Sequence, residues 1–321
     1  MSCGGHGGGV IGGQIGAHQG GVEARPRGRG LSFKARSLDK RQACSAGPRG
    51  SPIGGFRVQE TTVTSWDQGW APLYDAADTM RMMQDYLDFY AGLVTPGTAS
   101  LLDLGCGTGS VTVAVAEAMR AHHPDAPALG IDLAPAMIDI AAARDGSIGW
   151  AVGDICDPPV TDRYDLVICC FHTLQLLPDD AALGQALAAA RRAMAPGARL
   201  AFDIYQPNLD FLKMAAAGGL EPGRIVRRFP DRTGRELIVR EEAVCDPDTL
   251  TYSGTWFLHD AETDARLPVD PMVQTLRQIY PEDLARHMAA TGLAMVERYG
   301  DLDGSNFTPD SKRQVVICAP A

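Results

Sequence analysis

The chain has 321 residues and an acidic balance, with 39 Asp and Glu against 29 Lys and Arg and a formal net charge of −10. Its length suits one large domain, or one domain with an insertion. Affinity for nucleic acid depends largely on neutralising phosphates, so this charge disfavours a nucleic-acid partner and favours small or cationic substrates. No run approaches the roughly eighteen consecutive apolar residues of a membrane-spanning helix, so no membrane partner is expected.

The first 58 residues differ in composition from the rest. Residues 1–50 carry eight Lys and Arg against two acidic residues, and they hold 14 of the 36 glycines. Such a segment buries too little apolar surface to offset its chain entropy, so residues 1–58 are predicted to be a disordered Gly/Arg-rich extension. An extension without function is the simplest interpretation, with an organellar transit segment or a basic tail as alternatives. Residues 59–321 would then form the folded domain.

The eight cysteines lack metal-binding spacing such as C-x-x-C, so no metal site is expected. Several lie within apolar strand patterns, which is typical of buried, reduced thiols, and the cysteine usage predicts a cytoplasmic protein. Cys169 and Cys170 would point to opposite faces of a strand, so a disulfide between them is not expected.

A glycine-rich stretch, L-L-D-L-G-C-G-T-G, occupies residues 101–109. A short apolar strand pattern precedes the glycines, and an alanine-rich helical pattern over residues 111–121 follows them. Glycines allow positive φ and a close approach of the backbone to a ligand, and the following helix presents unpaired N–H groups. The spacing differs from the dinucleotide fingerprint, because Ser110 stands where the third glycine is needed, and no P-loop Gly-Lys-Ser/Thr follows.

The spacing D-x-G-x-G-x-G, from residue 103 to 109, resembles the first motif of class I S-adenosylmethionine-dependent methyltransferases of the small-molecule, bacterial type. The resemblance implies that a carboxylate and the glycine turn cradle the amino-acid end of S-adenosyl-L-methionine. The residues that it assigns to this cradle are Asp103, Gly105, Cys106 and Gly107.

Two further strand ends extend the resemblance. Asp132 ends a strand pattern over residues 126–131, where its two oxygens can accept both hydroxyls of a ribose. The sequence G-I-D-L-A-P-A-M, residues 130–137, is similar to the second motif of the family and brings Leu133 and Met137 to the cofactor. Asp154 and Ile155, after a strand over residues 148–152, fit the third motif, which implies contacts to the adenine.

Aromatic residues precede the first motif and follow the fourth strand. Residues 64–94 have helical periodicity, and the resemblance implies that Tyr74 lids the cofactor, with core packing as its alternative role. The apolar strand over residues 164–170 places Cys170 and Phe171 beside the cofactor, because ligands lie beyond the carboxyl ends of parallel strands. His172, next in sequence, is a candidate general base or hydrogen-bonding residue, since imidazole exchanges protons near neutral pH. Tyr205, after a strand over residues 199–204, is a second catalytic candidate.

The sequence from about residue 206 onward predicts an insertion, followed by a last helix and the last two strands of the sheet. Alternating apolar and polar residues between 224 and 280 predict three or four antiparallel strands within an insertion over about residues 206–280. The insertion would shape an acceptor pocket or form a homodimer contact. A helix over residues 281–291 and strands over 293–299 and 313–318 follow. The predicted fold is α/β, a doubly wound, seven-stranded, mostly parallel sheet of the Rossmann-like methyltransferase type, with an antiparallel β insertion before the last helix.

The predicted function is transfer of the sulfonium methyl of S-adenosyl-L-methionine to N or O of a small-molecule acceptor by in-line displacement. Aromatic faces such as Phe171, Tyr205 and Trp256 would attract a cationic acceptor if core packing left them free. One alternative is a non-catalytic protein that uses this fold for regulation or binding. Others are methyl transfer to protein or nucleic acid, which the charge and the lack of an N/D-P-P-Y/F motif disfavour, and aminopropyl transfer, whose acidic pattern is not evident.

Overall fold

The computed structural model describes residues 69–77, 81–231 and 233–321, and for residues 75–77, 81 and 82 it describes the backbone alone. The predicted extension over residues 1–58 and the expected start of the first helix at residue 64 lie outside the described residues. Within residues 64–94 the structure places two helices, α2 (Ala71–Ala77) and α3 (Arg81–Gly92), where the periodicity predicted one.

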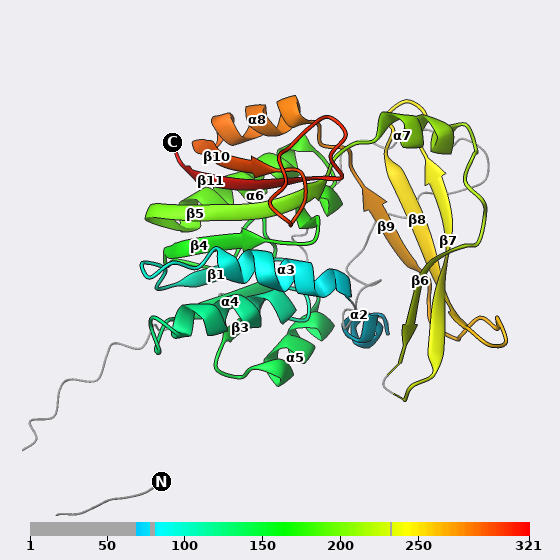
Figure 1. Cartoon of the computed structure of the whole chain (residues 1–321), viewed down its shortest axis with the longest axis horizontal. Coiled ribbons are helices and arrows are strands. Elements are labelled where there is room, and N and C mark those ends of the chain that lie inside the picture. The colour runs from blue at the N-terminus through cyan, green and yellow to red at the C-terminus, as the bar shows by residue number, and fades with distance from the viewer. Residues whose placement is uncertain (1–68, 78–80, 232) are drawn as a thin grey trace, which may run out of the picture. The chain divides into compact units, whose positions relative to one another are not determined.

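Seven strands form one sheet in the order β10-β11-β5-β4-β1-β2-β3 (Figure 1). The five strands from β3 to β5 are parallel, and β11 runs antiparallel to both of its neighbours. The predicted doubly wound, seven-stranded, mostly parallel sheet is therefore confirmed. The strands are β1 (Leu101–Leu104), β2 (Ala128–Asp132), β3 (Gly149–Val152), β4 (Tyr164–Cys169), β5 (Met194–Tyr205), β10 (Leu293–Tyr299) and β11 (Arg313–Pro320).

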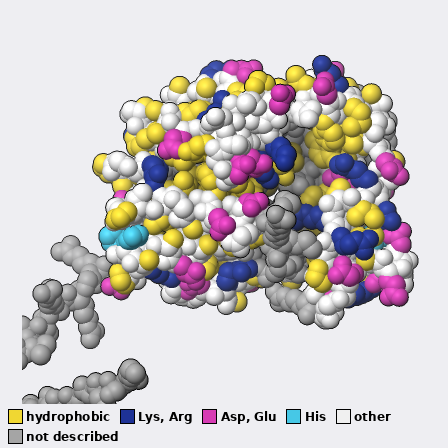
Figure 2. Space-filling model, in the orientation of Figure 1, with side chains coloured by type: hydrophobic (Ala, Val, Ile, Leu, Met, Phe, Trp, Pro, Cys, Tyr) yellow, Lys and Arg dark blue, Asp and Glu magenta, His cyan; other side chains and the backbone are white. Residues whose placement is uncertain are grey.

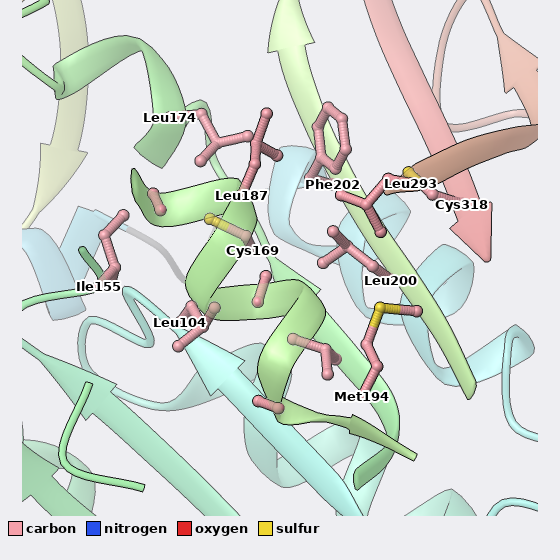
Figure 3. Packing of buried hydrophobic residues seen from close by; sticks show 14 of the residues in the cluster. Leu104, Ile155, Cys169, Leu174, Leu187, Met194, Leu200, Phe202, Leu293 and Cys318 are labelled. Atoms are coloured by element: carbon pink, nitrogen blue, oxygen red, sulfur yellow. The ribbon is translucent and has the colours of Figure 1, made fainter. Parts of the chain in front are cut away.

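Each face of the sheet has its own apolar core. Side chains of one face pack against α3 and α4, and those of the other face pack against α6 and α8. Neighbouring residues of β1, Leu101 and Leu102, enter different cores because successive side chains of a strand point to opposite faces. Figure 3 shows the second core, where Phe202, Leu187 and Leu293 come from a strand, a helix and the edge of the sheet. The other helices are α4 (Ser110–Arg120), α5 (Pro135–Arg144), α6 (Asp180–Ala193) and α8 (Pro281–Ala290).

Two local features differ from the sequence prediction. Strand β5 begins at Met194 instead of residue 199, and its pairing with β4 has an irregularity before Arg199, so the Pro196-Gly197 pair lies within a bulged strand. A short helix, α7 (Leu209–Ala216), was not predicted, because its eight residues are shorter than the window over which helical periodicity is recognised. Its start is fixed by Asn208, whose side chain accepts a hydrogen bond from the Phe211 N–H at 2.9 Å.

A second sheet of four antiparallel strands, in the order β6-β7-β8-β9, forms the predicted insertion. Figure 1 shows it beside the carboxyl ends of the parallel strands. Its apolar face packs against α2, where the Trp70 indole N–H donates to the Asp270 carbonyl at 2.6 Å. The insertion therefore covers the edge of the main sheet where ligands bind in such folds. Its strands are β6 (Arg224–Pro230), β7 (Glu236–Cys245), β8 (Tyr252–Asp260) and β9 (Met272–Leu276).

One face of the molecule carries both signs of charge. On the face drawn in Figure 2, basic and acidic side chains are interspersed.

Among the residues that the structure describes, no helix has the length and apolar character needed to cross a membrane. The described cysteines, Cys169 and Cys170 among them, are free thiols.

Candidate active site

The glycine turn joins β1 to α4 at the carboxyl edge of the sheet. Gly105, Gly107 and Gly109 have φ angles of +80°, +55° and +82°, a region that residues with a Cβ adopt at a cost. A Cβ on Gly105 would lie 2.5 Å from Thr173 Cγ2, in the segment that follows β4. Only glycine therefore lets the turn curl against the neighbouring loop.

Replacing Gly105 by alanine is expected to lower the free energy of unfolding by about 2–4 kcal/mol, from left-handed strain plus overpacking against Thr173. Gly304→Ala is the matched control, because Gly304 has a φ of +76° and no atom lies within 4 Å of the position that a Cβ would take there, so only about 1–2 kcal/mol of strain is expected. Urea unfolding of both variants measures the difference. Equal losses would show that Thr173 yields without cost.

Asp132 ends β2 next to this turn. One carboxylate oxygen accepts the Gly107 N–H at 2.8 Å, and the other accepts the Ala134 N–H at 2.9 Å. Asp154 follows β3, and its carboxylate accepts the Cys156 N–H at 2.8 Å. The three motif regions thus lie at the ends of adjacent strands, β1, β2 and β3.

Apolar surface is exposed between these carboxylates. Leu133, beside Asp132, is 49% exposed, and Val152, at the end of β3, is 45% exposed. Large aliphatic side chains are usually covered, so this edge offers apolar contacts as well as acceptors for hydrogen bonds. A flat base that carries an amino group and a ribose would use both.

Asp103 lies beneath the turn, not at the surface. Its side chain is 1% exposed and accepts the Thr112 hydroxyl at 2.6 Å through Oδ2, whereas Oδ1 is buried and has no hydrogen-bond partner among the described residues. Burial raises the pKa of Asp103 to about 7. An unsatisfied buried carboxyl oxygen is costly, so this site has an unused capacity for a polar ligand or water at the turn.

The other predicted cofactor residues differ in whether their side chains lie at the carboxyl edge of the main sheet or within an apolar cluster. Tyr74, half-buried in α2, has a ring carbon 4.0 Å from the position that a Cβ on Gly107 would take. Met137 packs with the α2 residue Ala71 in a small apolar cluster. Ile155 belongs to the main core, so only its backbone is available to a ligand.

The two predicted cysteines have inert thiols. Cys106 is half-buried in the turn, and its thiol lies 3.7 Å from the Gly107 carbonyl oxygen, whereas Cys170 is buried after β4. Burial raises the pKa of both thiols well above the ordinary value. Their side chains are thus suited to packing against a ligand, not to nucleophilic chemistry.

A buried carboxylate, Asp203 of β5, organises the acceptor side of the site. It is fully buried and accepts the Tyr86 hydroxyl at 2.8 Å, the Tyr90 hydroxyl at 2.9 Å and the Phe171 N–H at 3.0 Å. Burial alone would raise the pKa of Asp203, but the nearby His172 and the two tyrosine hydroxyls hold it below its usual value. Asp203 is therefore an ionised hub that connects α3, β5 and the loop after β4.

His172 contacts this hub through Nδ1, which lies 3.1 Å from Asp203 Oδ2. The contact has the distance of an ion pair without the alignment of a hydrogen bond. Phe171 and His172 have φ angles of +56° and +59°, and two consecutive left-handed residues other than glycine are costly. Such strain is typical of segments held in place for function.

Tyr205, the second catalytic candidate, lies against His172. The two rings stack with centroids 3.5 Å apart, and Tyr205 is 39% exposed. Burial raises the pKa of the Tyr205 hydroxyl, so at neutral pH it is a hydrogen-bond donor and not a base. Its backbone N–H donates to Gln175 Oε1 at 2.7 Å, and the Gln175 amide donates to the Arg277 carbonyl at 2.9 Å, which ties the site to the insertion.

The sequence interpretation missed the roles of Asp203, Tyr86 and Tyr90. The two tyrosines are four residues apart on α3 and follow the apolar periodicity of a helix, so they resembled core residues. A charged residue inside an otherwise apolar strand, as in L-A-F-D-I-Y, was the signal for Asp203.

Part of the chain is similar in sequence to known proteins. Residues 101–197 match the sequence model of a methyltransferase domain family. A trans-aconitate 2-methyltransferase from Methylobacterium radiotolerans is 34% identical over 122 residues, which cover 37% of this chain and 44% of the relative. Another protein of that name, from Methylobacterium nodulans, is 31% identical over 168 residues, which cover 50% of this chain and 62% of the relative. The chain spans about half the length of these curated relatives.

A solved structure, that of the CcbJ methyltransferase from Streptomyces caelestis, has the same fold. It superposes with a TM-score of 0.64 at 22% identity and covers 81% of this chain and 99% of its own. At this identity the likeness shows a shared fold.

Proposed function

We propose that this chain is a class I S-adenosylmethionine-dependent methyltransferase, which binds S-adenosyl-L-methionine and transfers its methyl group to an oxygen or nitrogen of a small molecule. The observation that carries the proposal is the alignment of three strand ends. The positive-φ glycine turn after β1, Asp132 after β2 and Asp154 after β3 lie side by side at one edge of the sheet. The curated relatives, named for trans-aconitate, support a small-molecule acceptor.

The residues at this edge fit the proposed cofactor. The unpartnered Asp103 Oδ1 leaves a polar site beneath the turn, and the exposed Leu133 and Val152 offer apolar surface for adenine. Asp132 would hold the ribose, and Asp154 the amino group of the base, because carboxylate oxygens accept hydrogen bonds from both. Tyr74 lies against the turn from α2 and would close over it.

The chemistry divides between the cofactor and the chain. When bound, S-adenosyl-L-methionine would supply a methyl group attached to a positively charged sulfur, and this sulfur is the leaving group when a lone pair on O or N of the acceptor attacks the methyl carbon in line. The chain must orient the acceptor, exclude water and accept the acceptor's proton. His172 receives this proton at Nε2, since Nδ1 faces Asp203. Asp203 is a positioning residue, because its contact with Nδ1 orients the imidazole ring.

The test is methyl transfer by the full chain. S-adenosylhomocysteine release is measured by mass spectrometry against a panel of small hydroxyl and amine acceptors. His172→Gln is expected to lower kcat about 100-fold to 10,000-fold, as loss of a general base does, without changing cofactor affinity. Unchanged kcat in this variant would contradict proton transfer to His172, and absence of turnover with cofactor bound would favour the regulatory alternative.

A further inference from the structure

A buried glutamine, Gln175, connects three parts of the candidate site. It lies in a short 3₁₀ helix, Thr173–Leu176, after β4, and is 1% exposed. Its side-chain oxygen accepts the Tyr205 N–H at 2.7 Å, and its side-chain nitrogen donates to the Arg277 carbonyl at 2.9 Å. Its own N–H donates to the His172 carbonyl at 2.8 Å, and its carbonyl accepts the Arg277 N–H at 3.0 Å. These four hydrogen bonds join the loop after β4, the end of β5 and the segment after β9.

The pairing of β4 with β5 explains why a side chain is needed at this point. Strand β4 ends at Cys169, which pairs with Phe202, whereas β5 continues to Tyr205. Past Phe202, β5 keeps β11 as a neighbour, but on its other edge β4 has ended. The Tyr205 N–H is therefore bonded by the Gln175 amide instead of by a strand. A buried N–H without an acceptor is costly, so this amide completes the hydrogen bonding at the end of β5.

The two backbone partners fix the orientation of the Gln175 amide. The Tyr205 N–H can only donate and the Arg277 carbonyl can only accept, so the amide oxygen must face the first and the amide nitrogen the second. An ionised glutamate would have no donor for the carbonyl, and a methionine of similar length would lack both groups. The position therefore requires a side chain that accepts and donates at once.

The residues held in this way are the two catalytic candidates. The ring of Tyr205 stacks on that of His172, with centroids 3.5 Å apart. His172 and its neighbour Phe171 have positive φ angles, which persist only where the surroundings fix them. On one side, Asp203 accepts the Phe171 N–H at 3.0 Å. On the other side, the Gln175 N–H closes the turn onto the His172 carbonyl. Gln175 thus contacts the backbone of both stacked residues.

We infer that Gln175 is a positioning residue, which holds the Tyr205 ring against His172 and so keeps the imidazole directed at the acceptor. The inference rests on the proposed function, in which His172 receives the acceptor's proton. The Gln175 side chain does not itself face a ligand, because it is buried and both of its polar ends are bonded. A misplacement of about 1 Å at a catalytic group can lower a rate about 100-fold. Through Arg277, which follows β9, the insertion becomes part of this support.

The first test follows the His172 ring by NMR in the full chain, labelled with ¹³C-histidine. Stacking places the imidazole protons in the ring current of Tyr205, so their resonance is expected upfield of those of the other histidines. Loss of the signal in His172→Gln identifies it. Gln175→Met removes both side-chain hydrogen bonds at similar length and is expected to move the resonance downfield. Gln175→Asn, which is too short to bond to both partners, is expected to move it in the same direction.

Gln314 provides the matched control. It is fully buried on β11, accepts a hydrogen bond from the Arg298 guanidinium and donates one to the Ile279 carbonyl at 2.9 Å. Gln314→Met therefore removes one accepted and one donated hydrogen bond from a buried glutamine, as Gln175→Met does. Its partners are not residues of the candidate site, so the His172 resonance is expected to keep its parent position. Thermal unfolding checks that each variant folds.

The second test is kinetic. In the methyl-transfer assay, Gln175→Met is expected to lower kcat about 10-fold to 100-fold and to leave the KM for S-adenosyl-L-methionine unchanged. In a chain that already carries His172→Gln, the same change is expected to lower kcat by less than about 2-fold, because the group that Gln175 positions is absent there.

Three results would overturn the inference. The His172 resonance could keep its parent position in the Gln175 variants, Gln314→Met could move it equally, or Gln175→Met could retain the parent kcat. The NMR measurement does not depend on turnover, so it is read whether or not the parent chain transfers methyl groups. A parent chain without methyl transfer fails the proposed function, whereas an active chain whose His172 resonance ignores Gln175 fails this inference alone.

Discussion

Asp132→Ala is expected to weaken binding of S-adenosyl-L-methionine by at least about 100-fold while the fold is retained. The carboxylate is predicted to accept two ribose hydroxyls, and each such charge-assisted hydrogen bond contributes about 1.5–3 kcal/mol. It also accepts the Gly107 and Ala134 N–H groups, so its loss loosens the turn that would hold the cofactor. Isothermal titration calorimetry measures the affinity, and thermal unfolding checks that the variant folds.

Asp139→Ala is the control for this prediction. Asp139 is an exposed residue of α5, seven positions further along the chain, and its replacement removes the same charge. The control is expected to bind the cofactor as the parent does, because an exposed charge contributes little. If both variants kept the parent affinity, the ribose would have to bind elsewhere on the edge of the sheet.

Asp203→Ala is expected to lower the free energy of unfolding by about 3–9 kcal/mol, since each of three buried donors left unsatisfied costs about 1–3 kcal/mol. In the variant three buried donors lose their acceptor, namely the Tyr86 and Tyr90 hydroxyls and the Phe171 N–H. It also releases His172, so kcat falls together with stability. Urea unfolding gives the first quantity, and the methyl-transfer assay gives the second.

The matched variant is Tyr90→Phe, which removes one donor and leaves the Asp203 carboxylate with its other partners. A loss of about 1 kcal/mol is expected there.

The buried carboxylate also makes the folded protein sensitive to acid, because the pKa of Asp203 is lowered in the folded state. Its stabilisation is present above the unfolded carboxyl pKa of about 4 and is lost as pH falls through the folded pKa. An Asp203→Ala variant with parent stability would contradict the hub.

Much of the main sheet could be predicted from the sequence, because local patterns encode it. Apolar runs, glycine turns and helix starts gave the seven strands and their connections in chain order. The start of β5 was predicted at residue 199 because Pro196 and Gly197 are typical of a turn, whereas pairing of Met194 with Tyr164 of β4 extends the strand across them. The left-handed pair at Phe171 and His172 could not be predicted, because long-range contacts to Asp203 hold it.

The cofactor side of the candidate site could be predicted, because each of its motifs is one continuous run of residues. Residues 103–107, 130–137 and 154–155 each lie in one short segment, so spacing alone brought them together. The acceptor side joins α3, β5 and the loop after β4, which are distant in sequence.

The central claim is that the glycine turn and its neighbouring carboxylates hold S-adenosyl-L-methionine. Calorimetric titration of S-adenosyl-L-methionine and of S-adenosylhomocysteine into the full chain, with NADH as a control ligand, tests it most directly. Binding of both sulfur compounds with one site per chain, and no binding of NADH, is the predicted result. Absence of binding by either compound, or equal binding of NADH, would contradict it.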